Sequence, residues 1–166
     1  MNDSMYEHIV PRKSGPIDLI KKFSVVLLLV IVFFVTFITI GPFAIVLVLI
    51  LGFFANMFIF TRFNVEYEYA LLNHDIDIDA IYSKQKRKRL LSFDFQKAEI
   101  IAPSNSPRLN AIKVEKVYDF SSKDPEIRTF SIIIPLDQKR TRIIIEPDQG
   151  MIEHMRTWMG SKFHFD

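Results

Sequence analysis

Five cations within six residues form the strongest candidate for a binding surface in this chain. They are Lys84, Lys86, Arg87, Lys88 and Arg89. Such side chains attract phosphate groups, and each one that reaches an anionic membrane surface contributes about 1 kcal/mol. Because side chains alternate between the two faces of a β-strand, the three lysines and the two arginines should face opposite ways. We therefore expect two or three charges to act together, which orients a domain without making a specific site.

Asp75, Asp77 and Asp79 precede the basic run and repeat at every second position. This spacing matches the start of a calcium-binding EF-hand loop, which also needs glycine at its sixth position and glutamate at its twelfth. Ala80 and Lys86 occupy those two positions, so no metal site is predicted. On a strand the three carboxylates share one face, from which they can pair with cations of the next strand.

The sequence lacks the residue patterns on which most enzymes depend. Four histidines are present, His8, His74, His154 and His164, and no two of them have metal-ligand spacing. The five glycines form neither a phosphate-binding loop nor a nucleophile elbow, and there is no cysteine. We therefore expect a protein that is not an enzyme and that carries no metal and no cofactor.

The elements that must position these residues include a membrane anchor. Residues 23–61 carry no ionisable side chain, and Gly41-Pro42 interrupts this apolar segment at its middle. As one helix the segment would be nearly twice as long as a hydrocarbon core of about 30 Å. We therefore predict a hairpin of two transmembrane helices in the lipid bilayer, Phe23 to Ile40 and Phe43 to Phe60, with its turn at residues 41–42. The alternative is a re-entrant hairpin within one leaflet.

Basic residues flank the apolar segment on both sides and predict its orientation. Arg12, Lys13, Lys21 and Lys22 precede it, and Arg62 follows it. Lys and Arg near the ends of a span stay on the cytoplasmic side. The protein is therefore expected in the cell membrane as a two-span protein with both termini in the cytoplasm.

Asn56 is a polar residue of the second predicted span, and its amide needs a partner outside its own helix. One hypothesis is an interhelical or homo-oligomeric contact, which is worth about 0.6 to 2 kcal/mol. The other is that the amide reaches the lipid headgroups, because the residue lies close to the end of the span.

Composition divides the chain into four parts. Residues 1–15 are expected to form a mobile cytoplasmic tail, and residues 16–61 form the membrane hairpin, with Pro16 as its first helical residue. Residues 62–160 form a cytoplasmic domain, and residues 161–166 form a C-terminal tail. Residues 62–166 contain 17 Lys or Arg and 16 Asp or Glu, so nucleic acid is not an expected partner.

Alternation of apolar and polar residues after residue 62 predicts seven strands. They span Asn64 to Leu72, Asp75 to Tyr82, Lys88 to Phe95, Ala98 to Ala102, Lys113 to Phe120, Thr129 to Pro135 and Thr141 to Glu146. An amphipathic helix should follow, with Asp148 as N-cap, Trp158 on its packed face and Gly160 at its end. The expected fold is a membrane α-hairpin plus a mainly-β domain, a curved antiparallel sheet or open barrel of six to seven strands with a C-terminal helix.

The order of these elements resembles the bacterial pleckstrin-homology-like (PH-like) domains that follow paired transmembrane helices. Residues 69–73, Tyr-Ala-Leu-Leu-Asn, with Ile76 and Ile78, are similar to the Tyr-x-Leu-Thr-Asn strand and return strand of these domains, with Leu72 in place of threonine. Residues 91–100 resemble the segment that leads into the next hairpin, and residues 147–159 resemble the C-terminal helix. The run Glu66-Tyr67-Glu68-Tyr69 after two spans is also similar to a group of small two-span membrane proteins of Gram-positive bacteria. The resemblance implies a PH-like fold over about residues 64–160 and supplies no ligand.

Two functional hypotheses follow. In the first, the domain is a membrane-tethered scaffold that binds a protein partner, or a second copy of the chain, through a sheet edge or a helix face. In the second, the basic hairpin of residues 84–89 binds anionic lipid headgroups, as the basic hairpins of eukaryotic PH domains bind inositol phosphates. We favour the scaffold, because a domain already held by two spans gains little localisation from weak lipid contact. The identity of the partner or ligand and the oligomeric state are not encoded in any motif.

Overall fold

The computed structural model of the chain describes residues 6–60 and 64–166. Four antiparallel strands form its first sheet, in the order β1 (Tyr6–Pro11), β2 (Val65–Leu72), β3 (Asp75–Tyr82) and β4 (Lys86–Asp94). One face of this sheet enters the core, where Tyr69, Leu71, Ile76 and Ile78 are completely buried. The other face carries the acidic side chains that alternate with them, as expected for an antiparallel sheet with one solvated face.

The second sheet has the strand order β5 (Ile100–Pro103), β7 (Phe130–Leu136), β8 (Lys139–Ile145) and β6 (Lys116–Asp119). β6 pairs with β8 in parallel, so the prediction of a wholly antiparallel sheet was wrong at this position. The tight turn at Asp137 and Gln138, both with positive φ, pairs β7 with β8 directly. β5 occupies the other side of β7, and β6 lies at the outer edge of β8.

Both sheets and the C-terminal helix α3 (Gln149–Met159) contribute to one apolar core. The predicted mainly-β fold with a C-terminal helix is confirmed, and the described residues contain eight strands where six to seven were predicted. Asp148 caps α3 by accepting a hydrogen bond from the Met151 amide at 2.9 Å, and Gly160 ends the helix with a φ of 52°. Trp158 was predicted to pack in the core, and this prediction was wrong. It is 41% exposed and lies beside the rings of His74 and His154.

Residues 6–15 are not part of the mobile tail that the composition predicted, whereas residues 1–5 lie outside the described residues. Residues 6–11 form β1, which pairs with β2 along its whole length. Two contacts explain its position, because Val10 is 1% exposed in the core and the Tyr6 hydroxyl donates a hydrogen bond to Asp148. The predicted C-terminal tail also belongs to the domain, since Phe163 is buried and forms a parallel bridge with Ile101.

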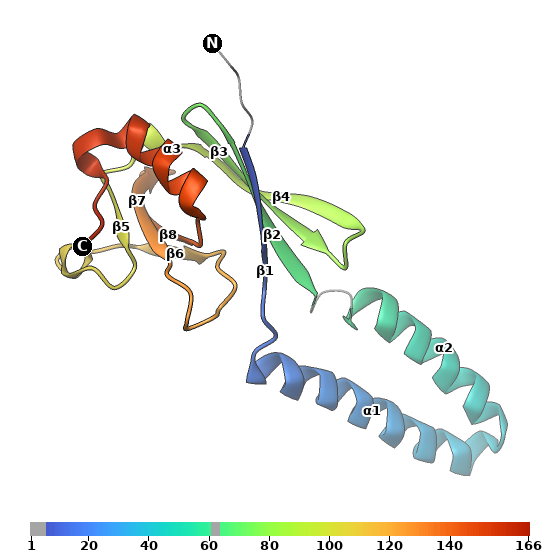
Figure 1. Ribbon diagram of the computed structural model, residues 1–166. Helices are drawn as coiled ribbons and strands as arrows, with labels where there is room; N and C mark the ends of the chain where they lie inside the picture. Colours follow the sequence, from blue (N-terminus) through green and yellow to red (C-terminus); the bar gives the residue numbers. More distant parts are fainter. Residues whose placement is uncertain (1–5, 61–63) are drawn as a thin grey trace.

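Two helices, α1 (Pro16–Ile40) and α2 (Phe43–Phe58), project from the domain as a hairpin (Figure 1). Gly41, with a φ of 59°, and Pro42 form the turn between them. Among the described helices, α1 is long and apolar enough to span a membrane, whereas α2 is apolar but shorter. Asn56 is exposed on α2, so its predicted interhelical contact is not made with α1 and stays a prediction for a second molecule. Arg62 and the predicted boundary at residues 61–62 lie outside the described residues.

Candidate functional site

The helical hairpin is inserted between two neighbouring strands of the first sheet. β1 and β2 pair down to Pro11 and Glu66, and both helices lie between these two strands in the chain. The start of α1 and the end of α2 therefore lie at the same end of the sheet (Figure 1). This end is also where β3 finishes and β4 begins, so the basic run lies close to the helical hairpin.

Residues between β1 and α1 are fixed to the domain by backbone hydrogen bonds. The Arg12 amide donates to the Val65 carbonyl at 2.9 Å, and the Lys13 amide donates to the Ser122 carbonyl at 2.8 Å. The Lys13 ammonium also forms an ion pair with Asp124 in the loop between β6 and β7. Strand β2 and the loop between β6 and β7 therefore hold the segment that enters α1.

The first turn of α1 is tied to the same segment by Asp18, which is only 6% exposed. Its carboxylate accepts a hydrogen bond from Arg12 at 3.0 Å and another from the Gly15 amide at 3.2 Å. A carboxylate in the first helical turn is also favourable to the helix dipole. Helix and sheet are thus joined by charged contacts over a connection of four residues, 12–15.

The basic run lies in the turn between β3 and β4 and in the first half of β4. Ser83 and Lys84 of this turn have positive φ values of 49° and 57°. A register shift between Ile78 and Asp79 leaves Leu90 as an extra residue in β4. Strict alternation from Phe93 and Leu91 would aim the two arginines at the core face. The bulge reverses this direction, so that Arg87 and Arg89 face outward and the lysines face the other way.

Arg87 and Arg89 are engaged by carboxylates of the outer face. The Nε atoms of Arg87 and Arg89 donate to the two oxygens of Asp79 at 2.8 and 2.9 Å. Arg87 also forms an ion pair with Glu68, and Arg89 lies 2.9 Å from Asp77. The predicted cross-strand pairing between the aspartates and the basic run is therefore present for both arginines.

Glu68 and Asp79 lie directly opposite each other on β2 and β3, and both are almost completely buried. Two opposed carboxylates repel each other, so the arginines above them are needed to neutralise this position. The hydrogen bond from Arg89 lowers the pKa of Asp79, an effect that outweighs the increase caused by burial. Asp79 reciprocally raises the pKa of Arg89. The arginines thus neutralise the acidic face of the sheet, and their predicted contact with a lipid or partner stays a prediction.

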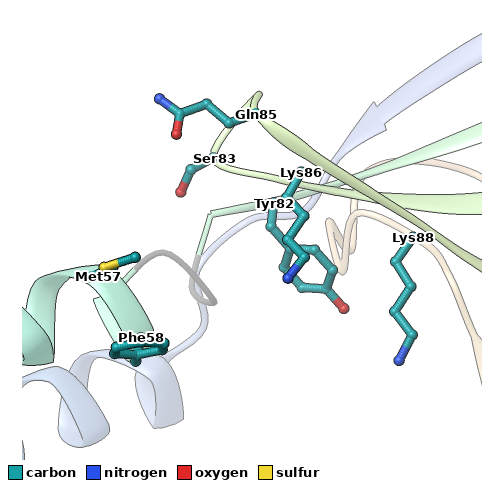
Figure 2. A pocket seen from close by; sticks show the side chains of 7 residues that line it. All are labelled: Met57, Phe58, Tyr82, Ser83, Gln85, Lys86 and Lys88. Carbon is teal, nitrogen blue, oxygen red and sulfur yellow. The ribbon is translucent and has the colours of Figure 1, made fainter.

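Lys86 and Lys88 lie on the opposite face of β4, beside Tyr82. Figure 2 shows both ammonium groups on the same side of the hairpin as the Tyr82 ring. Together with Met57 and Phe58 of α2 they line a cavity of about 530 Å³. In the part of the chain that the structure describes, neither lysine has an ion-pair or hydrogen-bond partner. Lys84, the remaining cation of the run, is largely exposed and lies 3.9 Å from Glu66.

The aspartate row does not converge on one point. Asp77 and Asp79 face the arginines, whereas Asp75 groups with Asp94 and His74 at the other end of β3. His74 Nδ1 lies 3.2 Å from Asp94 and 3.6 Å from Asp75. Asp94 also accepts a hydrogen bond from the Gln96 amide.

The sequence alone identified the five cations but not the apolar and aromatic residues that line the cavity beside Lys86 and Lys88. Tyr82, Met57 and Phe58 had been assigned to a strand and to a membrane span without any relation to the basic run. The signal that would have connected them is the order of the elements, because α2 leads directly into β2, which is the register partner of β3.

Comparison with known proteins places this architecture in a family. A model of the bacterial PH-like domain (DUF6106) matches residues 2–165. The chain belongs to this family. The matched range of the PH-like domain includes β1, both helices and the basic hairpin, so the family pattern runs through the inserted helices. Neither a curated protein nor a solved structure matches the chain.

Proposed function

We propose that this protein is a non-enzymatic, membrane-anchored interaction module. The helices α1 and α2 form a two-span hairpin in the cell membrane, both termini lie in the cytoplasm, and the PH-like domain binds a protein partner at the membrane surface. The observation that carries the proposal is the insertion of the hairpin between paired strands β1 and β2. An anchor attached in this way presents the domain in one orientation.

The distribution of charge supports the membrane position. Arg12, Lys13, Lys21 and Lys22 all lie at the domain end of the hairpin, whereas its turn at Gly41 and Pro42 carries no charge. This asymmetry is the one that retains a segment on the cytoplasmic side. The 16 residues of α2 span about 24 Å as a helix, somewhat less than a hydrocarbon core of about 30 Å, a difference that bilayer thinning can accommodate.

The free edge of β4 is the surface that best fits a protein partner. β4 has nine residues and pairs only with β3 in the described sheet, so its outer backbone groups can accept another strand. Its second half, around Ser92, lies beyond the basic run at the end of the sheet away from the helices. A partner with an extended segment can add there without contact with the bilayer.

Topology is tested with reporters fused to each terminus and inserted at Gly41-Pro42. Terminal reporters should report the cytoplasm, and the inserted reporter should report the outside. A C-terminal reporter on the outside would contradict the proposed orientation, and an inserted reporter in the cytoplasm would favour a re-entrant hairpin.

The partner surface is tested by photo-crosslinking in native membranes. A photoreactive residue at Ser92, which is exposed on β4, should give a discrete adduct whose protein can be identified by mass spectrometry. The same residue at exposed Lys113, on the second-sheet side of the domain, is the matched control. Absence of a specific adduct at Ser92 would overturn the assignment of the β4 edge.

A further inference from the structure

We infer that the cavity beside Lys86 and Lys88 binds the phosphate group of an anionic phospholipid from the surrounding bilayer. Tyr82 and the last turn of α2 complete this site. The inference rests on the proposed insertion of the hairpin and assigns a second role to its cytoplasmic end. The lipid site and the β4 edge around Ser92 lie at different ends of the first sheet, so both can be occupied at once.

The first argument is that the arginines and the lysines of the basic run have different partners. Arg87 and Arg89 are held by Glu68, Asp77 and Asp79 on the outer face, whereas Lys86 and Lys88 are exposed and have no ion-pair partner among the described residues. The bulge at Leu90 produces this arrangement by reversing the facing of the preceding residues. Two unneutralised ammonium groups are thereby directed away from the acidic face.

The second argument is the composition of the cavity. Of the described residues that line it, none is acidic, and Met57 and Phe58 provide an apolar wall opposite the lysines. Both side chains are 54% exposed. A free phosphate ion would use only the cationic side, whereas a phospholipid has a phosphate beside an acyl chain and matches both.

The third argument is position. Met57 and Phe58 end an apolar helix, so in the inserted hairpin they lie at the boundary between hydrocarbon and headgroups. The β3–β4 turn reaches the same level, because Tyr82, Ser83 and Gln85 line the cavity with them (Figure 2). Lysines next to such a boundary extend their ammonium groups toward headgroup phosphates. The bound lipid would fix the tilt of the domain over the membrane.

The test uses the full-length chain in lipid nanodiscs made of phosphatidylcholine alone or of phosphatidylcholine mixed with phosphatidylglycerol. Hydrogen exchange of the amides in residues 82–88 is measured in both. Slower exchange in the anionic discs, on the order of tenfold for two partly screened lysines, is expected. Lys86→Gln with Lys88→Gln should abolish the difference, and Lys86→Arg with Lys88→Arg should retain it. The matched control is Lys113→Gln with Lys139→Gln, which removes the same charge from exposed positions of the other half of the domain.

The possible results separate the two proposals. A chain that does not enter nanodiscs and is extracted from membranes by alkaline carbonate would overturn the anchor and the lipid site together. Correct insertion with equal exchange in the two lipids would overturn the lipid site alone. If inorganic phosphate added to phosphatidylcholine discs reproduces the protection, the ligand is a free anion and the assignment to a phospholipid is wrong. Protection that the Lys113 and Lys139 control also loses would reflect net charge and would overturn the site.

Discussion

Pro11 and Glu66 are register partners at the end of the β1–β2 ladder, although the complete helical hairpin lies between them in the chain. The strand before the hairpin is therefore as much a part of the domain as the strand after it. Closing such a long connection costs entropy, which the buried contacts of β1 must offset. Stability of the whole domain should consequently depend on the first residues of the chain.

Substitution of Val10 tests this dependence. Val10 is 1% exposed and faces the core, whereas its neighbour Ile9 is 50% exposed on the opposite face. Val10→Thr keeps the β-branched shape and places a hydroxyl in the core, at a cost of about 1–3 kcal/mol. Ile9→Thr, the matched control, should change stability by about 0.5 kcal/mol or less. Thermal unfolding of the full chain in detergent measures both, and equal effects would mean that β1 does not contribute to the domain.

Local patterns in the sequence were sufficient for most elements. β3 was predicted at its observed limits, and β2, β4, β7 and β8 were each predicted with ends within two residues of those observed. The cap at Asp148 and the stop at Gly160 were also correct, because they depend on a few adjacent residues. Alternation and capping are local properties, and so a local argument can find them.

β1 and the direction of β6 could not be found in this way. β1 is six residues long, ends at Pro11 and finds its partner only beyond both helices, so its pairing leaves no local signal. The parallel pairing of β6 with β8 depends on how the chain crosses from β5 to the far edge of the sheet, which no local pattern encodes. The cavity beside Lys86 has the same origin, since it depends on the bulge at Leu90 and on the position of α2 against the hairpin.

The two arginines and two lysines of the basic run should differ in their effect on stability. Arg87→Gln with Arg89→Gln leaves Glu68 and Asp79 opposed without their cations, and a buried carboxylate deprived of its partner costs about 3–5 kcal/mol. Lys86→Gln with Lys88→Gln removes the same charge from exposed, unpaired positions and should leave the unfolding temperature almost unchanged. The arginine variant should recover stability when Glu68→Gln and Asp79→Asn are added. Equal destabilisation by the two double variants would contradict the assigned roles.

Acid should weaken the same contact. The pKa of Asp79 is lowered in the folded protein, chiefly by the hydrogen bond from Arg89, from an ordinary value of 3.8. A lowered pKa stabilises the fold above the unfolded value, and this contribution is lost as the pH falls through the folded value. Asp79→Asn should therefore be less stable than the parent at neutral pH and should lose less stability below about pH 4. Exposed Asp137→Asn is the control and should follow the acid unfolding curve of the parent.

The hydrogen bond from the Tyr6 hydroxyl to Asp148 should show the opposite dependence on pH. It raises the pKa of Tyr6 to about 12, and Asp148 also caps α3 through the Met151 amide. Tyr6→Phe should destabilise the domain by about 1.5–3 kcal/mol, the value of a hydrogen bond to a charged group. Because the folded pKa lies above the unfolded value of about 10, the contribution is complete below pH 10 and is lost as the pH rises toward the folded value. The difference in unfolding free energy between the parent and Tyr6→Phe, measured by chemical denaturation, should therefore shrink as the pH rises from about 10 toward 12. Tyr82→Phe removes a hydroxyl that has no hydrogen-bond partner among the described residues, so it should show no such difference. If the difference in unfolding free energy between the parent and Tyr6→Phe stayed constant up to about pH 12, the hydroxyl would have no role in stability. The effect of the substitution would then come from the packing of the ring.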